Sequence, residues 1–259
     1  MKIRTVSPEI DDSRYMEFDF DFPGAPRAIL STVAAGNMKY DPSGVNLARG
    51  RLFAGLGLDP SRILSLQLRH TRGVIFQQRG EAMMDLHQKA DALGGADGLV
   101  VAEPDSIPAL TVADCMPIWL FDQKNEVFGL LHSGWRGTGI LKKAVTGMVS
   151  RFGSAPEDIS AILGPSIGAC CYAVPEERAM GFAAEFGETS IHVASAEQGK
   201  DGVSFSIDLR AANIHLAENL GLGALLDVKI CTSCSPTLGS FRRQGAQDFT
   251  RMLAICGYF

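Results

Sequence analysis

The sequence lacks several features that mark whole classes of protein. Its 259 residues contain no apolar stretch long enough to span a membrane and no long run of lysine or arginine. A membrane span needs about 20 apolar residues, and a nucleic-acid interface needs a basic patch. With a net charge of -5, we expect a protein that binds neither membranes nor nucleic acids. Residues 1–12 also lack the apolar core of a signal peptide, so we expect a cytoplasmic protein.

Disulfide spacing is also missing. The six cysteines do not form the regular pattern of a small disulfide-bonded scaffold, and a chain of this length can bury a core without one. We therefore expect reduced thiols. Apolar residues make up 46% of the chain and charged residues 20%, which is typical of a globular protein.

Apolar patterns that predict strands and helices follow one another without strict alternation. A hairpin is expected among them, so the sequence favours an α+β fold with mixed β-sheets layered with helices. We expect one domain over residues 1–259, with an irregular segment at 1–27 that holds an edge strand of alternating phenylalanines. Strands are predicted at 28–33, 63–68, 74–76, 99–101, 118–121, 127–132, 159–163, 191–193, 203–207, 226–231 and 252–255. Helices are predicted at 47–57, 82–93, 140–151, from Pro175 onward and at 208–220, and the loop 195–202 is expected to be the most mobile.

The centre of the pattern is the apolar run 127–132, which ends on His132. A glycine-containing turn at 133–138 follows, and a predicted helix begins at residue 140. Backbone amides at a helix start attract anions, and Arg136 lies among them. The polar turn 122–126 predicts a hairpin that would bring Cys115 close to His132.

His70, Cys115 and His132 each follow or precede a predicted strand beside a turn. One thiolate and two imidazoles suit zinc, and three protein ligands leave a fourth position for water, as in catalytic sites. From spacing alone, the alternative is that Cys115 is a small buried apolar residue and that both histidines are ordinary.

Four motifs together resemble one family over roughly residues 46–251. It is the YfiH/LACC1 family, also called the polyphenol oxidase laccase or purine nucleoside phosphorylase LACC1-type family. The motifs are Thr111–Ile118, His132–Thr138, Gly164–Tyr172, and Cys231–Thr232 with Ser240–Arg243. The resemblance implies a CNF1/YfiH-like sandwich and a metal set of His70, Cys115 and His132. Two departures are Leu68, where the family usually has glutamine, and a shorter segment before Asn46.

The remaining candidates have a functional and a structural interpretation each. Arg136, Arg242 and Arg243 would bind phosphate, or they would be surface and ion-pair residues. Asp114 would orient a metal ligand, or only stabilise a turn. Cys170 and Cys171 are interpreted as packing residues, the Cys231-x-x-Cys234 spacing as weak evidence for a metal, and His87, His192 and His215 as non-functional.

Four functions follow as hypotheses. The resemblance implies a zinc-dependent enzyme that phosphorolyses adenosine, inosine, guanosine or methylthioadenosine and deaminates adenosine, with purine nucleosides and phosphate as its small-molecule partners. Catalysis would rest on Cys115, His132 and Asp114.

A copper polyphenol oxidase is less favoured, because only five histidines are present. A metal-free hydrolase would use Cys115 as nucleophile and His132 as base, on amides or cell-wall peptides. A zinc-stabilised binding protein would need a fourth ligand, such as Cys170 or Cys171. The oligomeric state stays open.

Overall fold

Three β-sheets form the framework of the protein. The computed structural model describes residues 1–9, 13–44, 46–81, 86–195 and 203–259. The largest sheet has the order β1 (Lys2–Val6), β14 (Ala224–Val228), β10 (Ile159–Leu163), β8 (Met116–Asp122), β9 (Val127–Ser133), β6 (Gly98–Val101) and β5 (Val74–Gln77). A second sheet has the order β2 (Tyr15–Phe18), β3 (Arg27–Ser31), β15 (Met252–Gly257), β7 (Ile107–Val112) and β4 (Ile63–Ser65). A small third sheet has the order β11 (Ala173–Val174), β13 (Val203–Ile207) and β12 (Ile191–Ser195).

Helices cover the outer faces of the two larger sheets. The α-helices are α1 (Leu47–Leu56), α2 (Leu86–Ala92), α3 (Ile140–Phe152), α4 (Glu176–Phe186), α5 (Leu209–Leu220) and α6 (Phe241–Gln244). Short 3-10 turns are η1 (Val33–Ala35), η2 (Pro60–Arg62), η3 (Pro156–Asp158) and η4 (Glu188–Ser190). None of these described helices combines the length and apolar character needed to cross a bilayer.

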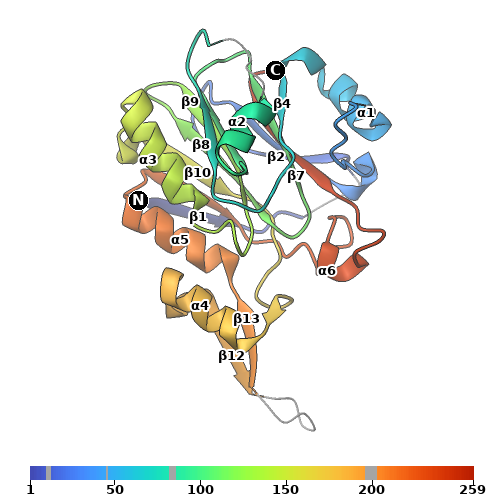
Figure 1. Cartoon of the computed structure of the whole chain (residues 1–259), viewed down its shortest axis with the longest axis vertical. Helices are drawn as coiled ribbons and strands as arrows, with labels where there is room; N and C mark the ends of the chain where they lie inside the picture. The colour runs from blue at the N-terminus through green and yellow to red at the C-terminus, as the bar shows by residue number, and fades with distance from the viewer. Residues whose placement is uncertain (10–12, 45, 82–85, 196–202) are drawn as a thin grey trace.

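Three apolar clusters define the layers. The first joins the large sheet to α3 and α5, the second fills the space between the two larger sheets, and the third joins the second sheet to α1. The result is a helix–sheet–sheet–helix sandwich, with α3 and α5 on one side and α1 on the other (Figure 1). Helix α4 and the small sheet project from one end of it (Figure 1). The predicted α+β fold with mixed sheets is confirmed.

Strand β8 shows why both faces of the large sheet are covered. Ile118 and Leu120 point into the cluster shared with α3, whereas Trp119 and Phe121 point into the cluster between the sheets. Side chains alternate between the faces of a strand, so a continuous apolar run buries both faces at once. Its antiparallel partner β9 pairs Pro117 with His132, which confirms the predicted hairpin.

Helix α3 holds the turn after His132 in place. Its buried apolar side chains recur with helical spacing at Ile140, Leu141, Ala144, Val145 and Met148. The helix begins after Gly139 and ends at Gly153, both of which have left-handed backbone angles (φ 99° and 69°) that glycine adopts without strain. The apolar face fastens α3 to the sheet, and the turn at residues 134–139 is fixed with it.

The predicted irregular segment at 1–27 is wrong in part. It contains β1, which pairs in parallel with β14, and β2, which forms the edge of the second sheet and ends at Phe18. Strand β1 is mostly exposed, so it has little of the apolar pattern by which strands are recognised.

Other boundaries differ from the predictions by a few residues, and β7 was not predicted as a strand. The predicted strand at 226–231 is β14 (Ala224–Val228), and the one at 63–68 is shortened to β4 (Ile63–Ser65). The predicted loop at 195–202 and the first turn of the helix at 82–93 fall on residues 196–202 and 82–85, outside the described residues.

Candidate metal centre

His70, Cys115 and His132 converge on one point. A ring nitrogen of each histidine and the Cys115 sulfur lie within 4.8 Å of one another. The two imidazole rings are 5.0 Å apart between centroids and meet edge to face, with an interplanar angle of 75°. His132 is 3% exposed, whereas His70 is exposed. The cluster therefore extends from the exposed His70 through the half-buried Cys115 to the buried His132.

Two of the donors lie where the chain crosses from one sheet to the other. His70 lies between β4 of the second sheet and β5 of the large sheet. Cys115 likewise lies between β7 of the second sheet and β8 of the large sheet. His132 is near the end of β9. Residue His70 has a φ of 56°, a left-handed angle that is uncommon outside glycine. Such an angle persists only where the surroundings fix it.

Asp97 fixes the backbone of His70. The sequence did not predict this role, because Asp97–Gly98 was interpreted only as a turn. Its carboxylate is fully buried and accepts the backbone amides of Arg69 (3.2 Å), His70 (2.9 Å) and Thr71 (2.7 Å). The same carboxylate lies 3.0 Å from Nδ1 of His132. One side chain thus holds the loop of the first histidine and the ring of the second, leaving Nε2 of His132 to face the cluster.

In the cluster, Cys115 and His132 favour opposite charges. Burial opposes ionisation of the Cys115 thiol, but the adjacent His132 and His70 lower its pKa to about 6. Burial also opposes protonation of His132, yet the Cys115 charge and the hydrogen bond to Asp97 raise its pKa to about 10. Near neutral pH the pair therefore holds a thiolate beside an imidazolium. A thiolate is the form of cysteine that binds metals.

Replacing Asp97 by asparagine should weaken zinc binding by about 10- to 100-fold, the usual effect of losing a partner that orients a metal ligand. Asparagine keeps one acceptor oxygen but cannot hold a charged His132 or satisfy three backbone amides together. The affinity is measured by competition with a chromogenic chelator.

Asp91→Asn is the matched control for this substitution. Asp91 is exposed, pairs with Arg69 in the same region and touches none of the three donors. Its replacement should leave zinc affinity within about 2-fold of wild type, since exposed ion pairs contribute little. Equal affinity of Asp97→Asn and wild type would show that Asp97 does not position the donors.

Gly134 allows Cys115 to reach the cluster. A Cβ added at Gly134 would lie 2.5 Å from the Cys115 sulfur, closer than any real contact. Only glycine fits at this point of the turn, so the glycine in the motif has a steric reason. The turn and the donor are built as one unit.

The structure does not place Asp114 against a metal donor. Its carboxylate accepts the hydroxyl of Thr232 (2.6 Å) and the backbone amide of Arg242 (2.7 Å). Asp114 has a φ of 78°, so these bonds hold the backbone directly before Cys115. The ligand-orienting contact expected of Asp114 is made instead by Asp97.

The two arginines of the C-terminal motif are occupied by the backbone. Arg243 donates to the carbonyls of Thr232, Ser233, Ser235 and Leu238. A guanidinium has five donors, and this one uses them to fix the loop that precedes it. Arg242 donates to the carbonyl of Ala173, at 3.2 and 3.3 Å, and lies over the ring of Tyr172.

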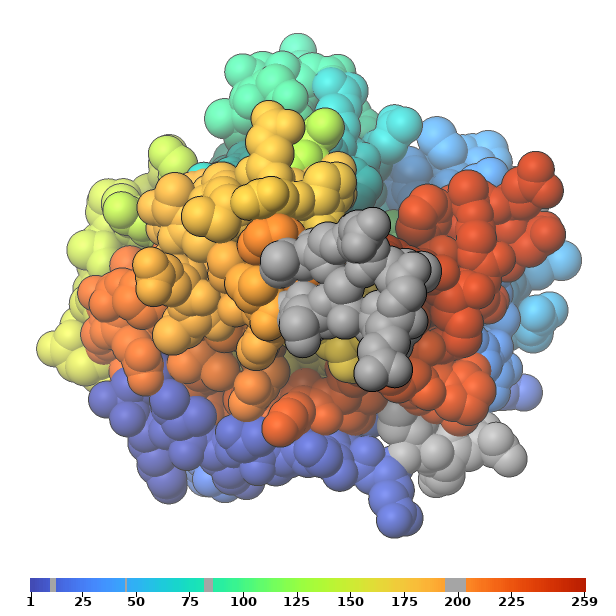
Figure 2. Space-filling view, turned by 90° about the horizontal axis from the view of Figure 1, so that it is seen from below, coloured from blue at the N-terminus to red at the C-terminus, as the bar shows by residue number. Residues whose placement is uncertain are grey.

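Arg136 lines a cleft of about 530 Å³ with a cation that the sequence did not single out, Arg178. Both guanidiniums lie over the Trp135 ring, at 5.2 Å and 4.0 Å from its centroid. Among the described residues neither has an ion-pair partner. Arg178 and the Cys115 charge both act on the pKa of Tyr172, which burial raises to about 12. Trp135 and Arg136 directly follow Gly134, which packs against the Cys115 sulfur, so the cleft lies next to the turn of the donor cluster. Figure 2 shows the end of the molecule at which α4 lies, in yellow-orange.

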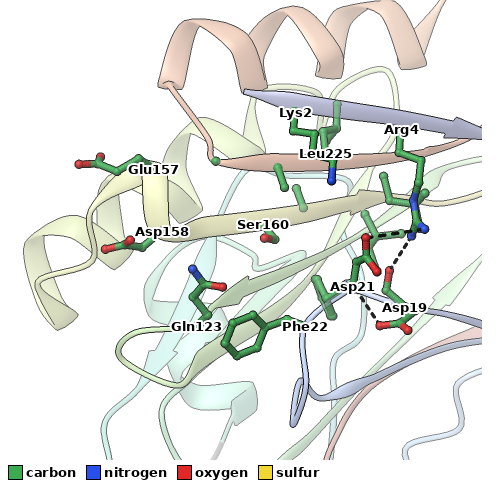
Figure 3. Close-up of a pocket in the computed structure, with 16 residues that line it drawn as sticks. Lys2, Arg4, Asp19, Asp21, Phe22, Gln123, Glu157, Asp158, Ser160 and Leu225 are labelled. Atoms are coloured by element: carbon green, nitrogen blue, oxygen red, sulfur yellow. Dashed lines mark hydrogen bonds and ion pairs between the residues drawn. The ribbon is translucent and has the colours of Figure 1, made fainter.

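A second hollow lies elsewhere, at the edge of the large sheet. It has a volume of about 280 Å³ and is bounded by β1, β10, β14 and the segment of residues 19–22 (Figure 3). Arg4 and Asp21 form a long ion pair of 3.9 Å across its rim. None of its lining residues belongs to the donor cluster, so we assign no function to it.

A family model described as multi-copper polyphenol oxidoreductase laccase matches residues 29–258. The chain belongs to this family. Its members include YfiH and LACC1, so the family expected from the four motifs is confirmed. The match includes all three donors and the cleft arginines.

Curated relatives in the family carry names of purine enzymes. Adenosine deaminase RL5, from an unknown prokaryotic organism, is 33% identical over 76% of this chain and 76% of its own length. Purine nucleoside phosphorylase YlmD of Bacillus subtilis is 30% identical over 70% of this chain and 64% of its own length. Purine nucleoside phosphorylase LACC1 of Mus musculus is 34% identical over 54% of this chain, which spans only 33% of the mouse protein.

Solved structures of the family share the fold. YlmD of Geobacillus stearothermophilus has a TM-score of 0.70 at 27% identity, covering 90% of this chain and 92% of its own. The protein NMB0706 of Neisseria meningitidis has a TM-score of 0.72 at 23% identity, covering 95% and 99%. The family's sandwich is therefore the architecture of this chain.

Proposed function

We propose that this protein is a zinc-dependent purine nucleoside enzyme that phosphorolyses nucleosides such as adenosine, inosine, guanosine or methylthioadenosine, and deaminates adenosine. The observation that carries the proposal is the convergence of His70, Cys115 and His132 within 4.8 Å. Beside them lies a cleft with two arginines that have no ion-pair partner among the described residues. The names of the relatives, a deaminase and several phosphorylases, point to the same two reactions.

The donor set fits zinc. One thiolate and two imidazoles form a borderline-soft set, and three protein ligands are the usual number at catalytic zinc sites. Bound there, zinc would act as a Lewis acid and lower the pKa of a water molecule toward neutrality. The family description names several coppers, but among the described residues only these two histidines join a donor cluster. A multi-copper oxidase needs more histidine ligands than these two.

The chain's own residues bind and orient the substrates. Asp97 keeps a proton on Nδ1 of His132 and so fixes the ring for its ligand role. The cleft has the size of a small-molecule site, with Trp135 and Phe182 as apolar walls. Arg136 and Arg178 would hold the phosphate, whose oxygen bonds to the ribose carbon as the bond to the base breaks.

The direct test is to incubate zinc-loaded protein with adenosine, with and without phosphate, and to separate the products by chromatography. With phosphate we expect adenine, hypoxanthine, ribose 1-phosphate and inosine, and without it inosine alone. The absence of all four products would refute the proposed function.

A metal-free cysteine hydrolase is the second candidate, because the lowered pKa of Cys115 makes it a thiolate beside His132. Such an enzyme would keep full activity on an amide or peptide substrate after exhaustive chelation. A zinc enzyme would lose activity and regain it with zinc. The hydrolase leaves His70 without a role, so the zinc enzyme is preferred.

Zinc binding should release about one proton from the Cys115–His132 pair at pH 8. With the thiol pKa near 6 and the imidazole pKa near 10, the metal-free pair holds one proton at this pH, on His132. Zinc takes the thiolate and the neutral ring, so this proton must leave. Calorimetry in buffers of different ionisation heats measures the number.

The sign of the pH dependence follows from the same two groups. As the pH falls below 6 the thiol regains its proton, so zinc affinity falls and proton release by the pair rises toward two. A release near zero at pH 8 would show that His132 is neutral in the metal-free protein.

A further inference from the structure

Four of the six cysteines form a second cluster away from the three donors of the metal centre. The sulfur atoms of Cys170, Cys171, Cys231 and Cys234 lie within 4.8 Å of one another. They come from two segments, the loop before β11 and the turn after β14. The sequence interpretation of Cys170 and Cys171 as packing residues is therefore incomplete, and the alternative that either joins the His70 site is wrong.

We propose that these four cysteines bind one structural zinc ion. Structural zinc sites are closed by four protein ligands in a tetrahedron, with zinc–sulfur distances of about 2.3 Å. That geometry sets the sulfur–sulfur edge at roughly 3.8 Å. The sulfur of Cys234 lies 3.7 Å from that of Cys170 and 3.4 Å from that of Cys171. Both distances are close to the tetrahedral edge.

The arrangement fits an ion better than disulfides. All six cysteines are free thiols, and a disulfide needs a sulfur–sulfur distance of about 2.05 Å. Cys234 is adjacent to two thiols at once, although it could form a disulfide with only one of them. Four sulfurs around one point are what a single tetrahedral ion requires, whereas an iron–sulfur cluster, with its several iron atoms, would hold its cysteines farther apart.

The backbone around Cys231 is shaped for a bound thiolate. The amide of Gly168 donates to the Cys231 sulfur at 3.2 Å. A Cβ at Gly168 would lie 3.2 Å from the Cys170 sulfur and 3.3 Å from Cβ of Cys231, so a side chain there would crowd the site. The amide of Cys234 bonds to the carbonyl of Cys231, which turns the second cysteine back toward the first. Hydrogen bonds to ligating sulfur are the outer contacts expected around a metal.

The ion would join two segments that support the catalytic side of the molecule. The first continues from Cys171 into Tyr172, and the second continues from Cys231 into Thr232, which bonds to Asp114. In the described residues, the backbone bonds between the two segments are the isolated bridge of Ser166 with Cys231 and the neighbouring bonds from Ser166 to Ile230 and from Thr232 to Ser166. Zinc bound by both would tie the loop before β11 to the loop before α6.

Metal counting tests the proposal without reference to enzyme activity. The full chain is purified under reducing, anaerobic conditions, and its metals are quantified by mass spectrometry. We expect two zinc ions per chain in wild type and in Cys256→Ala, whose buried thiol touches neither cluster. Cys234→Ser should lose one of the two, and His132→Ala should lose the other.

X-ray absorption at the zinc edge of His132→Ala identifies the remaining ligands, even if Cys234→Ser fails to fold. A shell of sulfur alone at about 2.3 Å supports the proposal. A nitrogen ligand in that shell, a wild-type zinc content that Cys234→Ser does not lower, iron or copper in place of zinc, or a disulfide among these cysteines in the intact mass would overturn it. Because the readout is metal content, the proposed nucleoside chemistry can fail while this site stands.

Discussion

His132→Ala should lower kcat/KM for adenosine deamination by at least about 10³-fold, which corresponds to roughly 4 kcal/mol of lost transition-state stabilisation. The substitution removes one of the three donors of the proposed zinc site and leaves the buried Asp97 carboxylate without its imidazole partner. Zinc at this centre should fall below half occupancy at micromolar concentrations. Steady-state kinetics and metal analysis of the same sample measure both effects.

His215→Ala is the matched control, because His215 is exposed on α5 and its bond in the described structure is to Asn219 of the same helix. It should retain wild-type activity and zinc content. Near wild-type deamination by His132→Ala that has lost its zinc would separate the reaction from the metal centre. Circular dichroism verifies that both variants are folded.

Replacing Arg136 and Arg178 together by alanine should reduce phosphorolysis far more than deamination. Phosphate is a substrate only of the first reaction, and within the described part of the chain these two cleft guanidiniums form no ion pair. We expect kcat/KM for phosphorolysis to fall by about 10²- to 10³-fold, roughly 3 to 4 kcal/mol, mainly through a higher KM for phosphate. Deamination should change by no more than about 3-fold.

Arg51→Ala provides the control for general loss of positive charge, since Arg51 is exposed on α1 on the far side of the sandwich (Figure 1). It should leave both reactions unchanged. An equal loss of both reactions in the double variant would mean that the arginines position the nucleoside or stabilise the fold rather than bind phosphate.

Arg243→Ala should instead lower the melting temperature, because its guanidinium donates hydrogen bonds to four backbone carbonyls.

The sequence was sufficient to predict the parts of the fold that repeat an apolar pattern. The run 127–132, the hairpin with β8 and the helix α3 all have strong periodicity and clear turns, so each was recognised. The same hairpin is what predicted that Cys115 approaches His132. Strand β1 was missed because its residues are mostly exposed, and its place in the sheet depends on pairing with β14, more than 200 residues away.

The residues missed at the site share one property, which is that their role depends on contacts distant in sequence. Asp97 bonds to Arg69–Thr71 and to His132, 26 to 35 positions away. A lone aspartate before glycine is typical of a turn, so nothing local distinguished it. Arg178 lies in the first turn of α4 and becomes a cleft residue because that helix packs beside Trp135. Such pairs are set by tertiary structure alone.

Because two donors lie where the chain crosses between the two sheets, the geometry of the metal centre depends on how the two sheets pack against each other. Two ligands are delivered by chain segments that leave one sheet and enter the other, and the third belongs to the large sheet alone. Any sliding of one sheet against the other would therefore separate the donors. Substitutions deep between the sheets, such as at Phe128, would weaken zinc binding without touching a ligand, and zinc would in turn select the chains whose sheets have docked in register.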